Sequence, residues 1–216
     1  MLLDYFTNLN SGPGLWKWTS YFDLYEEQFG RYRDTEVVLV EVGIFSGGSL
    51  RMWREYLGAK ALIHGVDISP SVKAYEGMKK YGTPRIFVGA QSDSAFWSDV
   101  KSHVPPIDVF IDDGSHISRD QQTTFLNMWP HIAPRGLYWI EDVAPLNTIN
   151  PSTTHFFARL SLNKTFMSDV KSITTYNGVI VLQKSSAPFE THLWKKGTLW
   201  QPPKFWSTGG PEQQPG

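Results

Sequence analysis

The 216-residue sequence predicts an α/β fold: a doubly wound, mainly parallel seven-stranded sheet with helices on both faces and a C-terminal antiparallel hairpin. Between residues 37 and 141, short β-branched apolar runs alternate with helical patterns, which is typical of parallel strands joined by right-handed crossovers. The first apolar run ends in a glycine cluster, as strand-to-helix turns of such sheets often do. Asn177-Gly178 separates the last two apolar segments, and Asn-Gly is a strong hairpin signal.

The individual elements follow in chain order. A leading helix is expected over residues 19–29, because Thr19 and Ser20 can cap it and aromatic residues then recur at helical spacing. Strands of the parallel part are expected at 37–42, 61–67, 85–88, 107–112 and 136–141, with helices at 49–57, 71–81, 93–103 and 118–131. A helix near 154–161 and hairpin strands at 165–175 and 178–183 complete the prediction.

The length fits one domain, expected over residues 1–184 with a helical lead-in, followed by a Trp-, Pro- and Gly-rich tail at 185–216. The end of the tail, 209–216, is expected to be disordered. Trp194, Trp200 and Trp206 in the tail either pack on their own domain or support a homo-oligomer.

Composition limits the partners. The net charge of −1 supplies no broad positive field, so nucleic acid is not expected as a partner. The absence of cysteine excludes disulfides, Cys-ligated metals and a thiol nucleophile. Neither a membrane-spanning run nor a signal peptide is recognisable, so no membrane association is expected and the protein is predicted to be cytoplasmic.

Polar residues follow all five predicted parallel strands, at the sheet edge where open α/β sheets bind ligands. The clusters are Glu41 with the loop 43–49, then Asp67, 89–93, 112–116 and 141–142. The glycine loop either lets a ligand approach the backbone or merely makes a tight turn, since Phe45 stands where a dinucleotide fingerprint would place glycine. Asp67 suits a carboxylate that binds ribose hydroxyls, or else it stabilises a helix start.

Asp113, Glu141 and Asp142 follow neighbouring strands, so they are expected to converge. Clustered carboxylates favour a hard divalent cation, above all Mg²⁺, with Mn²⁺ or Ca²⁺ as substitutes. The alternative is that these acids cap helices or face solvent. His116 lies in a Gly-Ser turn just after Asp113, a context that suits a general base.

Four motifs together resemble class I S-adenosylmethionine-dependent methyltransferases. They are Glu41-Val-Gly-Ile-Phe-Ser-Gly-Gly-Ser49, Gly89-Ala-Gln-Ser-Asp93, Asp112-Asp-Gly-Ser-His116 and Trp139-Ile-Glu-Asp142. Within that class they are similar to metal-dependent sugar O-methyltransferases of macrolide biosynthesis, of the mycinamicin and macrocin type, and to the group once named cephalosporin hydroxylases. The likeness covers about residues 16–183.

The resemblance implies S-adenosylmethionine as cofactor, with S-adenosylhomocysteine as product. The implied cofactor-binding residues are Glu41, Gly43, Phe45, Ser46, Gly47, Ser49, Asp67, Ile68, Gln91, Ser92 and Asp112. Among these, Gly43 and Gly47 would contact methionine and ribose, Asp67 the ribose hydroxyls, and Gln91 and Ser92 the adenine. Asp113, Glu141 and Asp142 would match the metal ligands, and His116, with Asp113, the catalytic residues.

The predicted function is Mg²⁺-dependent methyl transfer to a hydroxyl of a sugar, a deoxyhexose such as rhamnose, within a glycan or glycoside that carries vicinal hydroxyls. One alternative is a catechol, phenolic or other natural-product O-methyltransferase, because aromatic residues could stack on an arene. A second alternative, of another class, is a non-catalytic domain that binds S-adenosylmethionine and recruits a partner.

Overall fold

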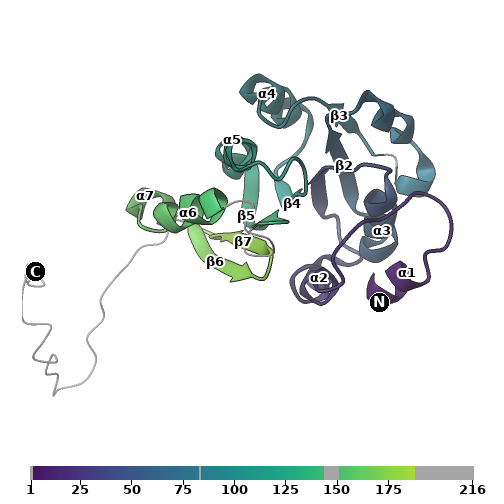
Figure 1. Cartoon of the computed structure of the whole chain (residues 1–216), viewed down its shortest axis with the longest axis horizontal. Coiled ribbons are helices and arrows are strands. Elements are labelled where there is room, and N and C mark those ends of the chain that lie inside the picture. The colour runs from purple at the N-terminus through teal and green to yellow at the C-terminus, as the bar shows by residue number, and fades with distance from the viewer. Residues whose placement is uncertain (1, 83, 144–150, 188–216) are drawn as a thin grey trace, which may run out of the picture.

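The computed structural model describes residues 2–82, 84–143 and 151–187, and its centre is a seven-stranded sheet (Figure 1). The strands are β1 (Val38–Val42), β2 (Leu62–Asp67), β3 (Ile86–Val88), β4 (Ile107–Asp112), β5 (Ile132–Ile140), β6 (Val170–Tyr176) and β7 (Val179–Lys184). Their order is β3-β2-β1-β4-β5-β7-β6. The first five are parallel, whereas β7 runs antiparallel to both β5 and β6. The predicted fold class is confirmed.

The strand order reverses between β1 and β4, which lie side by side. In their register Val42 is opposite Asp112, and on the other side of β1 it is opposite Val66 of β2. The carboxyl ends of three strands therefore meet at one place. Such a reversal opens a crevice above the strand ends, and the loops that follow β1, β2 and β4 border it.

Helices cover both faces of the sheet. The helical elements are α1 (Leu2–Thr7), α2 (Tyr21–Phe29), η1 (Gly30–Tyr32), α3 (Gly48–Leu57), η2 (Pro70–Tyr75), η3 (Lys79–Tyr81), α4 (Ser94–His103), α5 (Ser118–Met128), η4 (Trp129–His131), α6 (Pro151–Leu160) and α7 (Lys164–Met167). Figure 1 shows α1, α2 and α3 on one side of the sheet, with α4 and α5 on the other.

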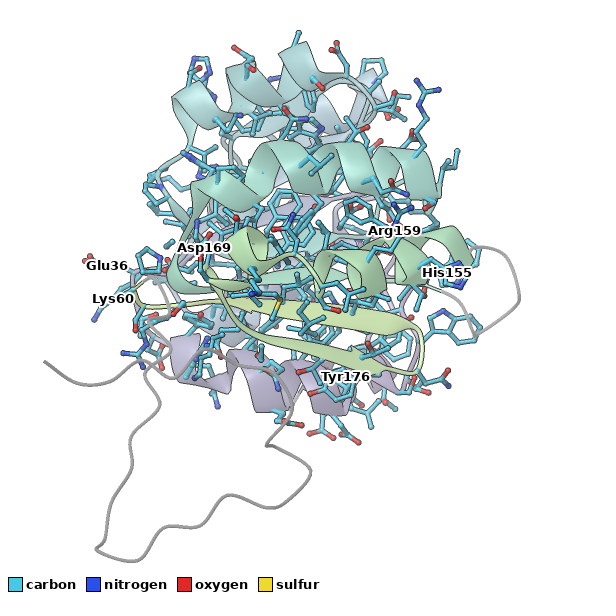
Figure 2. The ribbon with its side chains drawn as sticks, turned by 90° about the vertical axis from the view of Figure 1, so that its left-hand side faces the viewer. Glu36, Lys60, His155, Arg159, Asp169 and Tyr176 are labelled. Carbon is cyan, nitrogen blue, oxygen red and sulfur yellow. The ribbon has the colours of Figure 1, made fainter. Side chains whose placement is uncertain are left out.

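Alternate strand residues supply the two cores. Leu39 and Trp139 pack with the aromatic residues of α2 and with Trp53 of α3, whereas Val40 and Tyr138 face α4 and α5. Both faces of β1 are buried, which explains its unbroken apolar run apart from Glu41. Figure 2 shows the outer edge of the sheet, with His155 and Arg159 on α6 and Tyr176 at the end of β6.

Three local predictions are wrong. The helix expected at 71–81 is two short 3₁₀ segments, η2 and η3, because Gly77 between them adopts a left-handed φ of 67°. The strand expected from residue 165 starts at Val170, since the Asn163 side chain accepts from the Phe166 N–H and starts α7. Ser20 precedes α2, but its side chain makes no capping bond.

The tail lies outside the described residues from position 188 on, as do Trp194, Trp200 and Trp206 and the expected disorder at 209–216. The division at residue 184 therefore stays a prediction. Within the described segments, no helix is long and apolar enough to cross a membrane.

Candidate active site

A cavity of about 560 Å³ opens at the carboxyl ends of the parallel strands. Its walls come from the segment before α2 and from the loops that follow β1, β2, β3, β4 and β5. The lining includes Trp16, Lys17 and Trp18 from the segment before α2, together with Asp113, His116 and Asp142. It also includes residues of the glycine loop, Asp67, Ile68, Gln91 and Ser92.

Gly43 brings two of these loops into contact. Its φ is 85°, and a Cβ there would lie 1.9 Å from the carbonyl oxygen of Asp113, so no other residue fits without moving the backbone. The glycine loop after β1 is therefore held against the loop that carries Asp113 and His116. Phe45 follows with a positive φ of 44° and leaves its ring 73% exposed at the cavity.

Asp67 has a defined orientation beside the glycine loop. Its Oδ2 accepts from the Phe45 backbone N–H at 2.9 Å, and its Oδ1 accepts from the Ser69 N–H at 2.9 Å. Ile68 next to it is 73% exposed and also lines the cavity. This part of the wall combines a held carboxylate with exposed apolar surface.

Gln91 connects the loop after β3 to the loop after β4. Its Nε2 donates to Asp112, and its Oε1 accepts from the Ser115 N–H at 2.9 Å. Asp112 is fully buried, and burial raises its pKa to about 7, although the bonds from Gln91 and the Gly114 N–H oppose the rise. Asp112 therefore does not line the cavity, but it holds the side chain of Gln91, which does.

Three further residues expected to bind the cofactor are also not among those that line the cavity. Glu41 is fully buried, the Ser46 hydroxyl donates to the Gly14 carbonyl oxygen at 2.7 Å, and Gly47 packs against the Tyr75 ring. Gly43, Phe45, Ser49, Asp67, Ile68, Gln91 and Ser92 do line it. The structure thus divides the predicted set into lining and supporting residues.

One lysine is buried among three carboxylates. Lys17 Nζ donates to Asp113 Oδ2 at 2.7 Å, to Glu41 Oε1 at 3.0 Å and to Glu141 Oε2 at 3.0 Å. The Lys17 side chain is 3% exposed. Lys17, Glu41, Asp113 and Glu141 are called the lysine cluster below. Glu141 Oε1 also accepts from the Tyr25 hydroxyl and from the Trp139 indole, so both of its oxygens are engaged.

The lysine cluster is short of positive charge, with one ammonium for three carboxylates. Burial raises the pKa of Asp113 to about 7 and that of Glu141 to about 8, although Lys17 lowers both. Burial alone would lower the pKa of Lys17, but Asp113 and Glu141 raise it well above its usual value. A carboxyl group with a raised pKa holds a proton near neutral pH, and a metal cation bound beside the cavity can take the place of that proton.

Asp113, His116 and Asp142 form a second group, open to the cavity. One possible ligand atom from each lies within 4.8 Å of the others. His116 Nε2 is 3.6 Å from Asp142 Oδ2 and 4.0 Å from Asp113 Oδ1. The opposite oxygens are held: Asp113 Oδ2 by Lys17, and Asp142 Oδ1 by the Tyr21 hydroxyl at 2.8 Å and the Trp18 indole at 3.0 Å.

These three residues are called the open triad. His116 and Asp142 have left-handed φ values of 56° and 54°, a conformation that costs about 1–3 kcal/mol at each non-glycine residue. Two carboxylates and an imidazole with preset orientations suit a divalent cation. Of the metal ligands expected from the sequence, Asp113 and Asp142 meet here, whereas Glu141 turns to Lys17.

Sequence reasoning assigned no role to Lys17, and it did not connect Trp18 and Tyr21 with Asp142. The one available signal was a lysine between two tryptophans, which does not by itself distinguish a solvated side chain from a buried one.

Comparisons with known proteins identify methyltransferases as similar. Residues 40–143 match the family model described as a methyltransferase domain. The methyltransferase MycE of the mycinamycin biosynthetic pathway, solved in complex with Mg, SAH and mycinamycin VI, superposes with a TM-score of 0.68 at 25% identity. That match covers 85% of this chain and 52% of MycE. The resemblance to class I methyltransferases is confirmed.

Curated relatives narrow the resemblance to sugar O-methyltransferases. The 8-demethyl-8-alpha-L-rhamnosyl tetracenomycin-C 2'-O-methyltransferase of Streptomyces olivaceus is 38% identical over 144 residues, 62% of this chain and 36% of the relative. The mycinamicin VI 2''-O-methyltransferase of Micromonospora griseorubida is 35% identical over 126 residues, 55% of this chain and 30% of the relative. The chain thus spans about a third of the length of these relatives.

Proposed function

We propose that this chain transfers a methyl group from S-adenosylmethionine to a hydroxyl of a glycoside, with Mg²⁺ as metal cofactor. The observation that carries the proposal is that one cavity joins the glycine loop and Asp67 to the open triad. A donor and an acceptor bound at the two sides would share one volume, as an in-line displacement requires. The names of the sugar O-methyltransferase relatives support the same reaction.

The cofactor would lie on the glycine-loop side. Gly43 lines the cavity, Asp67 is oriented to accept from ribose hydroxyls, and Ile68 offers an apolar surface for the adenine. Gln91 and Ser92 would border the adenine from the next loop. Four residues that do not line the cavity would hold its loops in place: Glu41, Ser46, Gly47 and Asp112.

Asp113 and Asp142 would hold the metal ion, with either Glu141, as the resemblance implies, or His116, as the present geometry favours, as third protein ligand. When bound, Mg²⁺ would supply a Lewis acid that chelates two adjacent hydroxyls and lowers the pKa of one. The preset orientation of Asp113 by Lys17 and of Asp142 by Tyr21 reduces the reorganisation that binding needs.

His116 is the candidate general base for the acceptor hydroxyl where Glu141 completes the metal site, because an Nε2 that binds the metal ion has no lone pair left to accept the proton. It borders the cavity, is partly exposed, and its Nε2 faces the two carboxylates of the open triad. A neighbouring carboxylate stabilises the imidazolium that forms when the proton is taken. The preferred acceptor is a deoxyhexoside such as a rhamnoside, and a catechol is the competing acceptor.

The test is release of S-adenosylhomocysteine from S-adenosylmethionine with rhamnosides, other deoxyhexosides and catechols, each with Mg²⁺ and with EDTA. Metal-dependent release with a rhamnoside is the expected result. Release with catechols alone would assign a phenolic acceptor. Cofactor binding without release on any acceptor would contradict catalysis and favour a binding domain. Equal release of S-adenosylhomocysteine with and without EDTA would contradict the proposed requirement for a metal ion.

A further inference from the structure

One carboxylate of the cavity lining has no task in the proposed reaction. The described lining includes five acidic residues: Asp67, Asp113, Asp120, Glu141 and Asp142. Asp67 is assigned to the ribose, and the lysine cluster and the open triad contain Asp113, Glu141 and Asp142. Asp120, in the first turn of α5, remains without a role. Its side chain is partly exposed at the cavity.

Asp120 lies beside the loop that follows β3. Its Oδ2 accepts from the Ser115 hydroxyl at 2.9 Å, and the Ser115 backbone N–H donates to Gln91 Oε1 at 2.9 Å. One turn further along α5, the Thr124 hydroxyl donates to the Asp120 carbonyl oxygen at 3.0 Å and lies 3.4 Å from the Gln91 carbonyl oxygen. These contacts fix Asp120 next to Gln91, one of the residues that would border the adenine.

Gln91 itself presents little to a bound base. It is 7% exposed, its Nε2 donates to Asp112, and its Oε1 accepts from the Ser115 N–H. Asp120 differs from it, because Ser115 holds only Oδ2, and no group in the described parts of the chain donates to Oδ1. A carboxylate with a fixed position and one unengaged oxygen is therefore left where the edge of the base would lie.

The charges around Asp120 favour a hydrogen-bond donor from the ligand. The lining has one lysine, Lys17, which already donates to three carboxylates, and its described residues include no arginine. Asp120 also lies near buried Asp112, whose pKa its negative charge helps to raise. The exocyclic amino group of adenine is a hydrogen-bond donor. A purine with a carbonyl oxygen at position 6 would instead place an acceptor against the carboxylate, which opposes binding.

We propose that Asp120 determines which base the cofactor side accepts: its Oδ1 accepts a hydrogen bond from the exocyclic amino group of adenine. This inference rests on the proposed function and names the group that distinguishes adenine from a 6-oxo purine. An aspartate in the first turn of a helix also interacts favourably with the helix dipole. That contribution to stability does not depend on the base of the ligand, so the two roles can be separated.

The test compares S-adenosylhomocysteine with S-inosylhomocysteine, in which a carbonyl oxygen replaces the amino group. Each is titrated calorimetrically into the chain with Mg²⁺. The wild type is expected to bind the adenosyl compound at least about tenfold more tightly, the lower end for a hydrogen bond to a charged group. Asp120→Ala should bring the ratio of the two dissociation constants close to one. In Asp120→Asn the amide oxygen can keep the bond from Ser115 while the amide nitrogen donates to the base, so this variant should favour the inosyl compound.

The matched control is Asp99→Asn, which removes the same charge at an exposed aspartate of α4 outside the cavity lining and should keep the wild-type ratio. If Asp120 only stabilised α5, its variants would lower both affinities equally and keep the wild-type ratio, which would overturn the inference. Equal affinity of the wild type for the two compounds would also overturn it, while leaving a cofactor site intact. Binding of neither compound to the wild type would instead contradict the proposed function.

Discussion

The two groups of residues that share the Asp113 carboxylate differ sharply in exposure. On one side its Oδ2 joins the lysine cluster, in which Lys17, Glu41 and Glu141 are almost completely buried. On the other side its Oδ1 faces His116 and Asp142 of the open triad, whose side chains are 39% and 33% exposed. The lysine cluster contains its own cation, the Lys17 ammonium. The open triad has partly exposed side chains that a dissolved metal ion can reach.

This difference shows how a stable fold can contain several carboxylates close together. Buried carboxylates are tolerated because Lys17 donates to each of them, and every such bond also fixes an orientation. The open carboxylates need no built-in cation, since water or a bound ion can reach them. The lysine cluster thus acts as scaffold, and chemistry is assigned to the open triad.

Asp113→Asn is the strongest test of the comparison because Asp113 belongs to both groups. Methyl transfer is expected to fall by more than roughly the 10²–10⁴-fold that one general base contributes, since metal binding and the orientation by Lys17 are both weakened. The assay is S-adenosylhomocysteine release from a rhamnoside. Asp99→Asn, at an exposed aspartate of α4, is the matched control and should retain wild-type turnover.

His116→Ala changes the open triad alone. Turnover is expected to fall by roughly 10²–10⁴-fold, the usual contribution of a general base. The affinity for S-adenosylhomocysteine, measured by calorimetry, should stay within about twofold, because His116 is assigned to the acceptor side. Unchanged turnover would remove His116 from the role of base.

Lys17→Met removes the cation of the lysine cluster, which also releases Asp113 Oδ2, and its main effect is expected on stability. Removing one partner of a buried charge network costs about 3–5 kcal/mol of unfolding free energy, because the remaining charges stay buried and unpaired. Urea unfolding measures this. Lys73→Met is the matched control, because Lys73 pairs with Glu76 at the surface, with 49% exposure, and such pairs contribute about 0–1 kcal/mol. Equal losses in the two variants would contradict a special role of Lys17.

Stability should also depend on pH in a direction set by the lysine cluster. The folded pKa of Glu141 is raised to about 8 from a usual 4.5 by burial, so between these values the folded chain binds more protons than the unfolded chain. The unfolding free energy in EDTA is therefore expected to fall as pH rises from about 4.5 to 8. Urea unfolding at several pH values should show a shallower fall in Glu141→Gln, and an identical slope would contradict this assignment.

The sequence predicted the sheet because every parallel strand is an apolar run flanked by helical periodicity. It missed α1. It misplaced the start of β6 because the Phe166 N–H donates to the Asn163 side chain, a local hydrogen bond that composition does not reveal. The 3₁₀ segments around Gly77 were missed for a similar reason, because the sequence pattern alone did not show that this glycine adopts a left-handed conformation there.

The site was predictable where it follows strand ends. Asp67, Gln91, Asp113 and His116 line the cavity because their position after a strand places them there. Lys17 precedes every strand, and its partners lie 24, 96 and 124 positions away, so only the folded chain shows the contact. Glu141 and Asp142 are neighbours and both line the cavity, yet only Glu141 accepts from Lys17, which chain order alone does not reveal.

The most direct measurement is Mn²⁺ binding followed by electron paramagnetic resonance, on wild-type chain saturated with S-adenosylhomocysteine and on Asp142→Asn, Glu141→Gln and His116→Ala. We expect one Mn²⁺ per wild-type chain, displaced by Mg²⁺ and lost in Asp142→Asn. Whichever of Glu141→Gln and His116→Ala weakens binding more identifies the third ligand. No Mn²⁺ binding to the wild type, or undiminished binding to Asp142→Asn, would contradict the assignment of the metal to the open side of Asp113.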